Sequence, residues 1–315
     1  MTGHSPPPAL ARPQGSPVHD PYRHGPARRP PRRTAGGAIA GLVGTLAALA
    51  VAGILGYTAL GPDDGARGTG LRSERSVSRE AATRSPLYAT GTLTPVKCRL
   101  SVLSPGTASM RRFMDGLSDC LDASWEKQFG KARMEFERPK RVFWDQPGRS
   151  PCGTYPSPGT SAFYCPANGT MYVGLRHIVE TSGGEPLAHS AVFARVIAHE
   201  YAHHVQERAG ILAYGQREME RTSGPPRAEA SRRIELQAQC LAGAFLGAER
   251  ATLPMTRRQY TAMINDVRGR GDEHQAESRR DHGSSRNYAG WVVRGYRDER
   301  PAACNTWTAS SAAVG

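Results

Sequence analysis

The chain has 315 residues, with 41 lysine and arginine residues against 28 aspartate and glutamate residues, which gives a net charge of +13. This length allows one or two domains. The basic excess invites a nucleic-acid-binding function, but much of it lies in the N-terminal tail, and the sequence carries none of the signatures of nucleic-acid-binding folds. We therefore expect no nucleic-acid partner.

The N-terminal tail, residues 1–34, is rich in proline, holds six arginines and has no apolar periodicity. This composition predicts a disordered segment. Residues 35–60 follow without a single charged residue. As a helix rising about 1.5 Å per residue, this stretch is long enough to cross a bilayer core of about 30 Å. The sequence therefore predicts one transmembrane helix.

The arginines between positions 28 and 33 directly precede the apolar stretch. The positive-inside rule then places residues 1–34 in the cytoplasm and everything after residue 60 outside. The alternatives are a buried core helix, which seldom follows such a tail, and a cleaved signal peptide, for which the apolar stretch is too long. We expect a single-pass anchor in the cell membrane, a flexible linker over residues 61–86, and a folded domain over residues 87–310.

All six cysteines follow the apolar stretch. An even number of cysteines outside the cytoplasm favours disulfides, and the lack of any C-x-x-C pair argues against a zinc cluster. We choose the pairing mainly because two of the bonds close short loops: Cys98–Cys120, Cys152–Cys165 and Cys240–Cys304.

Hydrophobic patterning predicts an α+β fold that is mostly helical, with a small sheet. Asn168-Gly169 supplies the turn of a hairpin between Ser161–Cys165 and Thr170–Leu175. We expect a polar loop after residues 194–208, a stretch described below, and this loop includes Ser223-Gly224-Pro225-Pro226. The other predicted elements are a strand at Arg141–Trp144 and helices at Met110–Lys127, Ser231–Ala248, Met255–Val267 and Ser284–Arg297.

An H-E-x-x-H pattern lies within residues 194–208. On a helix, His199 and His203 are one turn apart, so two imidazole nitrogens can bind one metal ion, and Glu200 beside them can take a proton from water. The flanking residues are apolar on more than one side, which predicts a buried helix. Buried His and Glu side chains need partners, so we expect a zinc site here. His204 lies off the ligand face and is expected to form a hydrogen bond or to lie on the surface.

A catalytic zinc usually takes a third protein ligand and leaves a fourth position for water. Gln206 and Ala209 stand where the metzincin pattern needs Gly and His, so that pattern is excluded. We choose Glu235, because it lies in an apolar helix where an inward carboxylate needs a partner; the alternative there is a salt bridge to Arg232 or Arg233. Three other glutamates lie in polar surroundings: Glu207, Glu218 and Glu220.

Three blocks, in this order, resemble the neutral zinc metallopeptidase family of bacteria: His199–Gln206 (HEYAHHVQ), Glu235–Gly243 (ELQAQCLAG) and His282–Arg286 (HGSSR). The resemblance extends over roughly Pro86 to Trp307 and includes Trp291, Gly295 and Cys304-Asn305-Thr306. It implies a zincin-like fold and a gluzincin-like site, similar to that of thermolysin-type peptidases. In such a site His199, His203 and Glu235 bind one Zn²⁺, and Glu200 is the base.

Gln239 departs from the family pattern, which commonly reads E-L-Q-A-D-C. The Asp of that pattern usually accepts a hydrogen bond from a zinc-bound histidine and raises its basicity. Gln239 can accept through its amide oxygen but brings no charge. We therefore expect it in the second shell of the site, with weaker support for the metal than an Asp would give.

The function expected from these residues is zinc-dependent hydrolysis of peptide bonds in a peptide or protein substrate, as by an endopeptidase. His282 is a candidate donor to the oxyanion, and its alternative is a cap just before the helix at Ser284. The strand Thr170–Leu175 is a candidate to pair with an extended substrate. The rival hypotheses are a non-catalytic surface module with the peptidase fold, and an enzyme that hydrolyses a non-peptide amide.

Overall fold

The structure is a computed structural model that describes residues 78–157 and 160–315. The predicted tail, the predicted membrane span and residues 61–77 of the predicted linker lie outside the described residues. Within the described ranges, every helix is too short or too polar to cross a bilayer.

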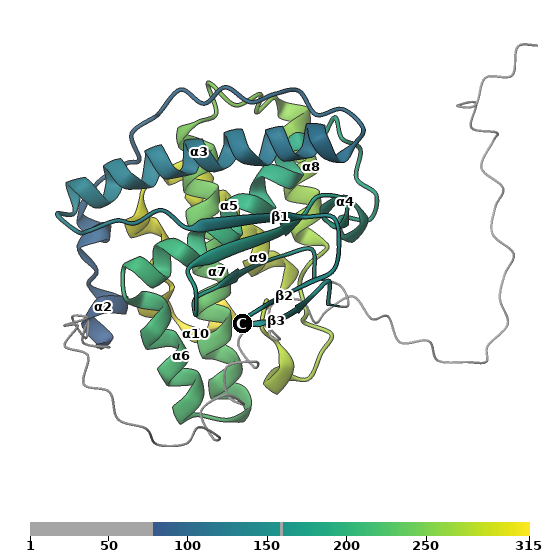
Figure 1. Cartoon of the computed structure of the whole chain (residues 1–315). Coiled ribbons are helices and arrows are strands. Elements are labelled where there is room, and N and C mark those ends of the chain that lie inside the picture. Colours follow the sequence, from purple (N-terminus) through teal and green to yellow (C-terminus); the bar gives the residue numbers. More distant parts are fainter. Residues whose placement is uncertain (1–77, 158–159) are drawn as a thin grey trace, which may run out of the picture. The chain divides into compact units, whose positions relative to one another are not determined.

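The described part of the chain is mostly helical with a small sheet, as predicted (Figure 1). The α-helices are α2 (Arg79–Thr83), α3 (Thr107–Lys131), α4 (His177–Thr181), α5 (Ser190–Arg208), α6 (Ile211–Arg221), α7 (Gly224–Ala248), α8 (Arg257–Arg268), α9 (Ser285–Asp298) and α10 (Ser311–Val314). The 3-10 helices are η1 (Pro86–Ala89), η2 (Glu277–Arg279), η3 (Pro301–Cys304) and η4 (Thr306–Thr308). The strands are β1 (Lys140–Trp144), β2 (Gly148–Ser150), β3 (Gly153–Tyr155), β4 (Ala162–Cys165) and β5 (Thr170–Gly174).

The main sheet has three strands in the order β1-β5-β4. β5 pairs with β1 in parallel and with β4 as the predicted antiparallel hairpin, in which Cys165 lies opposite Thr170. The expectation that Thr170–Leu175 pairs with a substrate is therefore wrong, because β5 is the central strand and both its edges are occupied. β1 and β4 are the two edge strands of this sheet, and β4 packs against α5.

The folded domain begins earlier and ends later than predicted. α2 and η1 occupy the end of the predicted linker, and Ala82 and Leu87 are buried in the core. At the other end, Val314 is buried and its carbonyl accepts a hydrogen bond from Arg232 Nε. The apolar residues at both ends, Ala82 and Val314, are too few to produce a periodic signal, which explains why the boundaries were misplaced.

The polar loop predicted after α5 is also wrong, because α6 fills it and α7 begins at Gly224. α6 buries Ile211, Leu212 and Met219 among otherwise polar residues. These positions lie on one helical face, a signal that the high charge of this stretch obscured. The prolines that suggested a loop stand in the first turn of α7, where their missing N–H groups need no partner in the helix.

Helices α5 and α7 form the centre of the domain. Every residue of α5 from Ala191 to Gln206 is buried. In α7, every residue from Ile234 to Ala248 is buried. α9 packs closely along α7 at glycines: a Cβ at Gly295 would lie 1.9 Å from the carbonyl oxygen of Cys240. The backbones of α7 and α9 are therefore in close contact at these glycines.

The six cysteines form the three expected disulfides. The Cα–Cα distances are 5.6 Å for Cys98–Cys120, 5.7 Å for Cys152–Cys165 and 5.3 Å for Cys240–Cys304. The last bond joins the middle of α7 to the end of η3 and so ties a central helix to the C-terminal segment.

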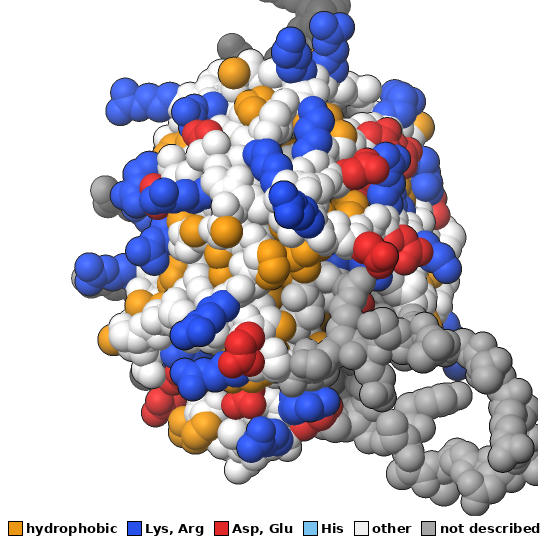
Figure 2. All heavy atoms as spheres, turned by 90° about the vertical axis from the view of Figure 1, so that its left-hand side faces the viewer, with side chains coloured by type: hydrophobic (Ala, Val, Ile, Leu, Met, Phe, Trp, Pro, Cys, Tyr) orange, Lys and Arg blue, Asp and Glu red, His pale blue; other side chains and the backbone are white. Residues whose placement is uncertain are grey.

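Figure 2 shows the face of the domain that is on the left in Figure 1. Lysine and arginine side chains are spread over this face, acidic side chains stand between them, and hydrophobic side chains gather near its middle. The basic charge on this face is therefore dispersed and does not form one continuous patch.

Candidate active site

Three side chains from the two central helices meet at one point. The Nε2 atoms of His199 and His203, both on α5, are 3.2 Å apart. Glu235 of α7 places Oε2 3.2 Å from His199 Nε2 and Oε1 3.6 Å from His203 Nε2. Atoms that bind a tetrahedral zinc at about 2.0–2.2 Å lie roughly 3.3 Å from one another. The donor types and their spacing therefore fit one zinc ion.

The charges at this point favour a cation. Burial lowers the pKa of His199 to about 4. Burial also lowers the pKa of His203, but the carboxylates of Glu235 and Glu200 outweigh it and raise that pKa to about 9. Burial opposes ionisation of Glu235, yet His203 and His199 hold its pKa well below the usual range. The site therefore keeps a positive charge beside Glu235, and either a proton on His203 or a metal ion can supply it.

Glu200 lies next to the ligands and is buried. Burial raises its pKa to about 7, while His203 and the backbone N–H of Tyr164 on β4 act in the opposite direction. A carboxylate with a pKa near neutrality is well matched to general-base catalysis. Its contact with the Tyr164 N–H also shows that the free edge of β4 faces this part of α5.

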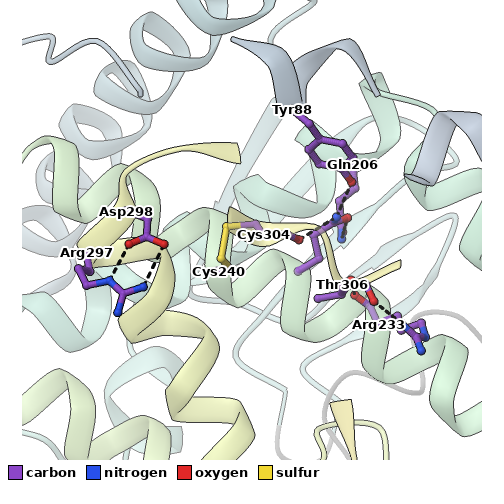
Figure 3. The surroundings of a disulfide bond; sticks show 9 residues. Tyr88, Gln206, Arg233, Cys240, Arg297, Asp298, Cys304 and Thr306 are labelled. Carbon is purple, nitrogen blue, oxygen red and sulfur yellow. Dashed lines mark hydrogen bonds and ion pairs between the residues drawn. A yellow bond between two sulfur atoms is a disulfide. The ribbon is translucent and has the colours of Figure 1, made fainter. Parts of the chain in front are cut away.

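A chain of buried amides supports His203. Figure 3 shows Gln206 from this chain together with Tyr88 and Cys304 at its far end. The Oε1 atom of Gln206 lies 2.9 Å from His203 Nδ1, so it accepts a hydrogen bond that leaves Nε2 free for a metal. Gln206 Nε2 donates to Gln237 Oε1 at 3.0 Å, and Gln237 Nε2 donates to the Cys304 carbonyl at 3.1 Å and to the Tyr88 hydroxyl at 2.8 Å. Sequence reasoning missed this role of Gln206, although its position three residues after His203 on the same helix offered a signal.

Gln239 takes a different position from the one expected. Its Nε2 donates to the hydroxyl of Tyr288 on α9, and its Oε1 has no hydrogen-bond partner among the described residues. The Nδ1 atom of His199 is likewise buried without a partner in the described part of the chain. Gln206 is therefore the amide that contacts a proposed ligand, His203, and Gln239 donates to Tyr288 instead.

His282 lies in the same cavity as His199, Glu200 and Glu235. Its alternative role as a helix cap belongs instead to Ser284, whose Oγ accepts the N–H of Asn287 at the start of α9. His282 is held by Asp272, whose Oδ2 accepts its backbone N–H at 2.9 Å. Burial lowers the pKa of the His282 ring, so the ring is neutral near pH 7 and can donate one hydrogen bond.

Asp272, Asp281 and His282 form a second buried group with metal-binding atom types. Asp272 Oδ2 also accepts the backbone N–H of Asp281 at 2.8 Å. Burial and the neighbouring Asp272 raise the pKa of Asp281 to about 8, so Asp281 is largely protonated near pH 7. This pair shapes the loop that carries His282.

Glu235 does not form the alternative salt bridge to Arg232 or Arg233. Arg232 donates to the carbonyls of Val314 and Arg280, and Arg233 pairs with Glu229 at 2.6 Å. Within the described residues, none of the three other candidate glutamates joins a metal-binding cluster. They lie at the end of α5 and on α6: Glu207, Glu218 and Glu220.

The cavity beside the ligands is narrow, with a volume of about 60 Å³. Ser161 and Ala162 from the edge of β4, Tyr288 from α9, and Arg195 and Arg270 line it together with the groups described above. A larger cavity of about 540 Å³ lies between α2, α6 and the start of α7, but no histidine lines it. The chemistry of the donors, and not cavity size, therefore identifies the site.

Comparisons with known proteins agree with this geometry. A family model described as "Putative neutral zinc metallopeptidase" matches residues 102–307. The chain is 27% identical over 249 residues to the "Uncharacterized protein YpfJ" of Escherichia coli K12, which covers 76% of this chain and 80% of that protein. It is 30% identical over 193 residues to the "Uncharacterized protein Rv2575" of Mycobacterium tuberculosis, which covers 54% of this chain and 62% of that protein. No solved structure matches the chain.

Proposed function

Because the chain belongs to the neutral zinc metallopeptidase family, we propose that it hydrolyses peptide bonds at a zinc ion held by His199, His203 and Glu235. The observation that carries the proposal is the meeting of these three donors, 3.2–3.6 Å apart, beside the buried carboxylate of Glu200. When bound, zinc supplies the Lewis acid that polarises a carbonyl and activates water. The remaining work falls to side chains of this chain.

Glu200 is the general base in this mechanism. Its carboxylate takes the proton of the attacking water and later delivers it to the leaving nitrogen. The burial that raises its pKa to about 7 also makes it a strong enough base for this transfer. A bound cation would limit this rise, so that Glu200 would be ionised at neutral pH while burial still strengthens it as a base.

His282 and Tyr288 line the same cavity and provide hydrogen-bond donors there. A neutral imidazole and a phenol can each donate to an oxyanion without placing a further charge in the site. Gln239 Nε2 donates to the Tyr288 hydroxyl, so that the phenol proton remains available to another acceptor. We assign His282 to this role, with Tyr288 as a second donor.

The free edge of β4 is the surface along which an extended substrate can lie. Ser161 and Ala162 line the cavity, and Tyr164 directs its N–H to Glu200. Main-chain pairing at a sheet edge holds a peptide without regard to most of its side chains. This placement favours an extended peptide over a small non-peptide amide as the substrate.

Two substitutions test the assigned roles. Glu200→Gln should leave zinc near one per chain and lower peptide hydrolysis by a factor on the order of 10², the usual worth of a general base. Glu235→Ala should lower the zinc content itself. Zinc content is measured by metal analysis, and hydrolysis is measured with a mixture of denatured proteins as substrate. The control is Glu220→Gln, which removes an exposed carboxylate on α6 and should change neither quantity. Loss of zinc from Glu200→Gln with retention in Glu235→Ala would reverse the roles.

One observation favours a non-catalytic module instead. Gln239 faces Tyr288, and His199 Nδ1 has no hydrogen-bond partner among the described residues, so this ligand lacks support that raises basicity. A module of this kind would bind zinc and cleave no peptide. One zinc ion per chain together with no hydrolysis of any protein in the mixture would support the non-catalytic module.

A further inference from the structure

Two arginines line the cavity beside the proposed zinc site. Arg195 stands one helical turn before His199 on α5 and is almost completely buried. Arg270 follows the end of α8, and 23% of its side chain is exposed. Buried arginines are rare unless they are paired, so the partners of this pair decide what it can do.

Asp266 is the carboxylate that both arginines contact. Arg195 Nη2 donates to its Oδ2 at 2.5 Å, and Arg270 Nε and Nη2 donate to Oδ2 and Oδ1 at 3.0 and 2.8 Å. Within the described residues no second carboxylate forms an ion pair with either arginine. The Nε atom of Arg195 is buried without a hydrogen-bond partner in the described part of the chain.

The charges around the cavity do not cancel. Glu200 and Glu235 together offset a bound divalent ion, and Asp266 offsets one of the two guanidinium groups. Asp272 accepts the backbone N–H of His282 and has Arg232 as a charged neighbour, and it forms no ion pair with Arg195 or Arg270. One positive charge therefore remains on the arginine side of the cavity, in a place where low exposure strengthens its field.

We propose that Arg270, reinforced by Arg195, binds a carboxylate of the substrate, which makes the site selective for acidic peptides. This inference rests on the proposed peptidase function and names its substrate class. Asp266 holds the guanidinium of Arg270 through Nε and Nη2, which leaves Nη1 as the group that can reach a ligand. The carboxylate comes either from an aspartate or glutamate side chain or from the C-terminus of the peptide.

Three matched peptides separate these sources. One has neutral side chains and a free C-terminus, the second has one glutamate and an amidated C-terminus, and the third has glutamine in place of that glutamate and an amidated C-terminus. We expect kcat/KM to be about tenfold or more higher for one of the first two than for the third, the worth of one charge-assisted hydrogen bond. Equal values for all three overturn the inference and leave the peptidase function standing.

Variants of the full chain locate the selectivity. Arg270→Gln should bring the three peptides to similar kcat/KM values, mainly through KM of the acidic peptide, and Arg270→Lys should restore part of the difference. Arg268→Gln removes an exposed arginine at the end of the same helix and should keep the full difference. The melting temperature of each variant verifies folding. Selectivity that survives in folded Arg270→Gln contradicts the inference.

A binding measurement keeps the inference testable if no peptide is cleaved. The zinc-loaded Glu200→Gln protein is titrated with the same three peptides by calorimetry, with and without Arg270→Gln. Tighter binding of an acidic peptide that depends on Arg270 supports the carboxylate site independently of hydrolysis. A carboxylate that binds only to the metal would bind equally to the Arg270→Gln form, and that result overturns the inference.

Discussion

His204 directly follows a proposed zinc ligand, yet its surroundings exclude it from the metal site. Its Nε2 lies 2.6 Å from the Glu137 carbonyl, which can only accept, so Nε2 carries the proton. Its Nδ1, 3.0 Å from the Tyr164 hydroxyl, then accepts a hydrogen bond. Burial favours this neutral form and lowers the pKa of His204 to about 4. The expectation of a hydrogen-bonding role is met, and the surface alternative is not, because the side chain is buried.

The lowered pKa of His204 predicts a loss of stability in acid. Its folded pKa of about 4 lies below the usual value near 6.5. The stabilising contribution is therefore complete above about pH 6.5 and is lost as the pH falls toward 4, by at most about 1.4 kcal/mol per pH unit. Urea unfolding of the zinc-free protein between pH 7 and 5 measures this slope. His204→Gln, which keeps a donor and an acceptor but cannot titrate, should show a shallower slope; an equal slope in both proteins would contradict the assignment.

Single residues of the site differ in how far the sequence could place them. His199, Glu200 and His203 are fixed by their spacing on one helix. Glu235 could be chosen only because a carboxylate in an apolar helix needs a partner. Gln206 was missed although it lies three residues after His203 on the same helix. The arginine pair was missed because Arg195 and Arg270 meet at Asp266 through contacts between two different helices, which no local pattern shows.

Among the helices, α9 packs closely on α7, the helix that carries Glu235. A Cβ at Gly243 would lie 2.3 Å from the Val292 carbonyl oxygen, and one at Gly295 would lie 1.9 Å from that of Cys240. Real side chains cannot occupy such positions unless the helices move apart. The glycines therefore set the distance between the backbones of the two helices.

Two substitutions on α9 test this packing. Gly295→Ala should destabilise the domain by roughly 1–3 kcal/mol or more, because its methyl group overlaps α7. Gly290→Ala is the matched control: it meets no atom within 4 Å, so better helix propensity should stabilise the domain by about 0.5–1 kcal/mol. Chemical denaturation measures both. A similar effect of the two substitutions would show that close packing of α7 and α9 is not needed.

The elements with the strongest periodicity were the easiest to predict. The apolar spacing of α3 and the Asn168-Gly169 turn between β4 and β5 each gave the correct structure. α6 was missed because a few apolar residues on one face are surrounded by charge. The central position of β5 was missed because parallel pairing with β1 joins segments separated by a long stretch of chain, and hydropathy carries no information on strand order.

For the whole molecule, the predicted membrane anchor remains a proposal. Residues 35–60 lie outside the described residues, and the proposal rests on their lack of charge and on the arginines before them. Three disulfides in the described domain suit a location outside the cytoplasm. We propose one membrane crossing, with the N-terminus in the cytoplasm.

Protease added to intact cells tests this topology. The domain after residue 60 should be digested once the cell wall is opened, and a tag placed at the N-terminus should be spared. Lysed cells, in which both ends should be digested, provide the control. A protected C-terminal domain together with a digested N-terminal tag would reverse the orientation.

The disulfide between Cys240 and Cys304 connects oxidation of the chain to the zinc affinity of the proposed site. The Cys304 carbonyl accepts a hydrogen bond from Gln237, Gln237 accepts one from Gln206, and Gln206 in turn orients His203. The disulfide and Gln206 are both drawn in Figure 3. A newly made chain still in the reducing cytoplasm has thiols here, and its histidine is correspondingly less well prepared for zinc. A Cys240→Ala/Cys304→Ala protein should bind zinc about 10-fold or more weakly than the unchanged protein. The control, Cys98→Ala/Cys120→Ala, should bind zinc with nearly unchanged affinity. Equal affinities of the two variants would show that the Cys240–Cys304 bond does not support the metal site. On the topology proposed above, the reduced chain would bind zinc weakly in the cytoplasm, and formation of this disulfide outside would complete the metal site.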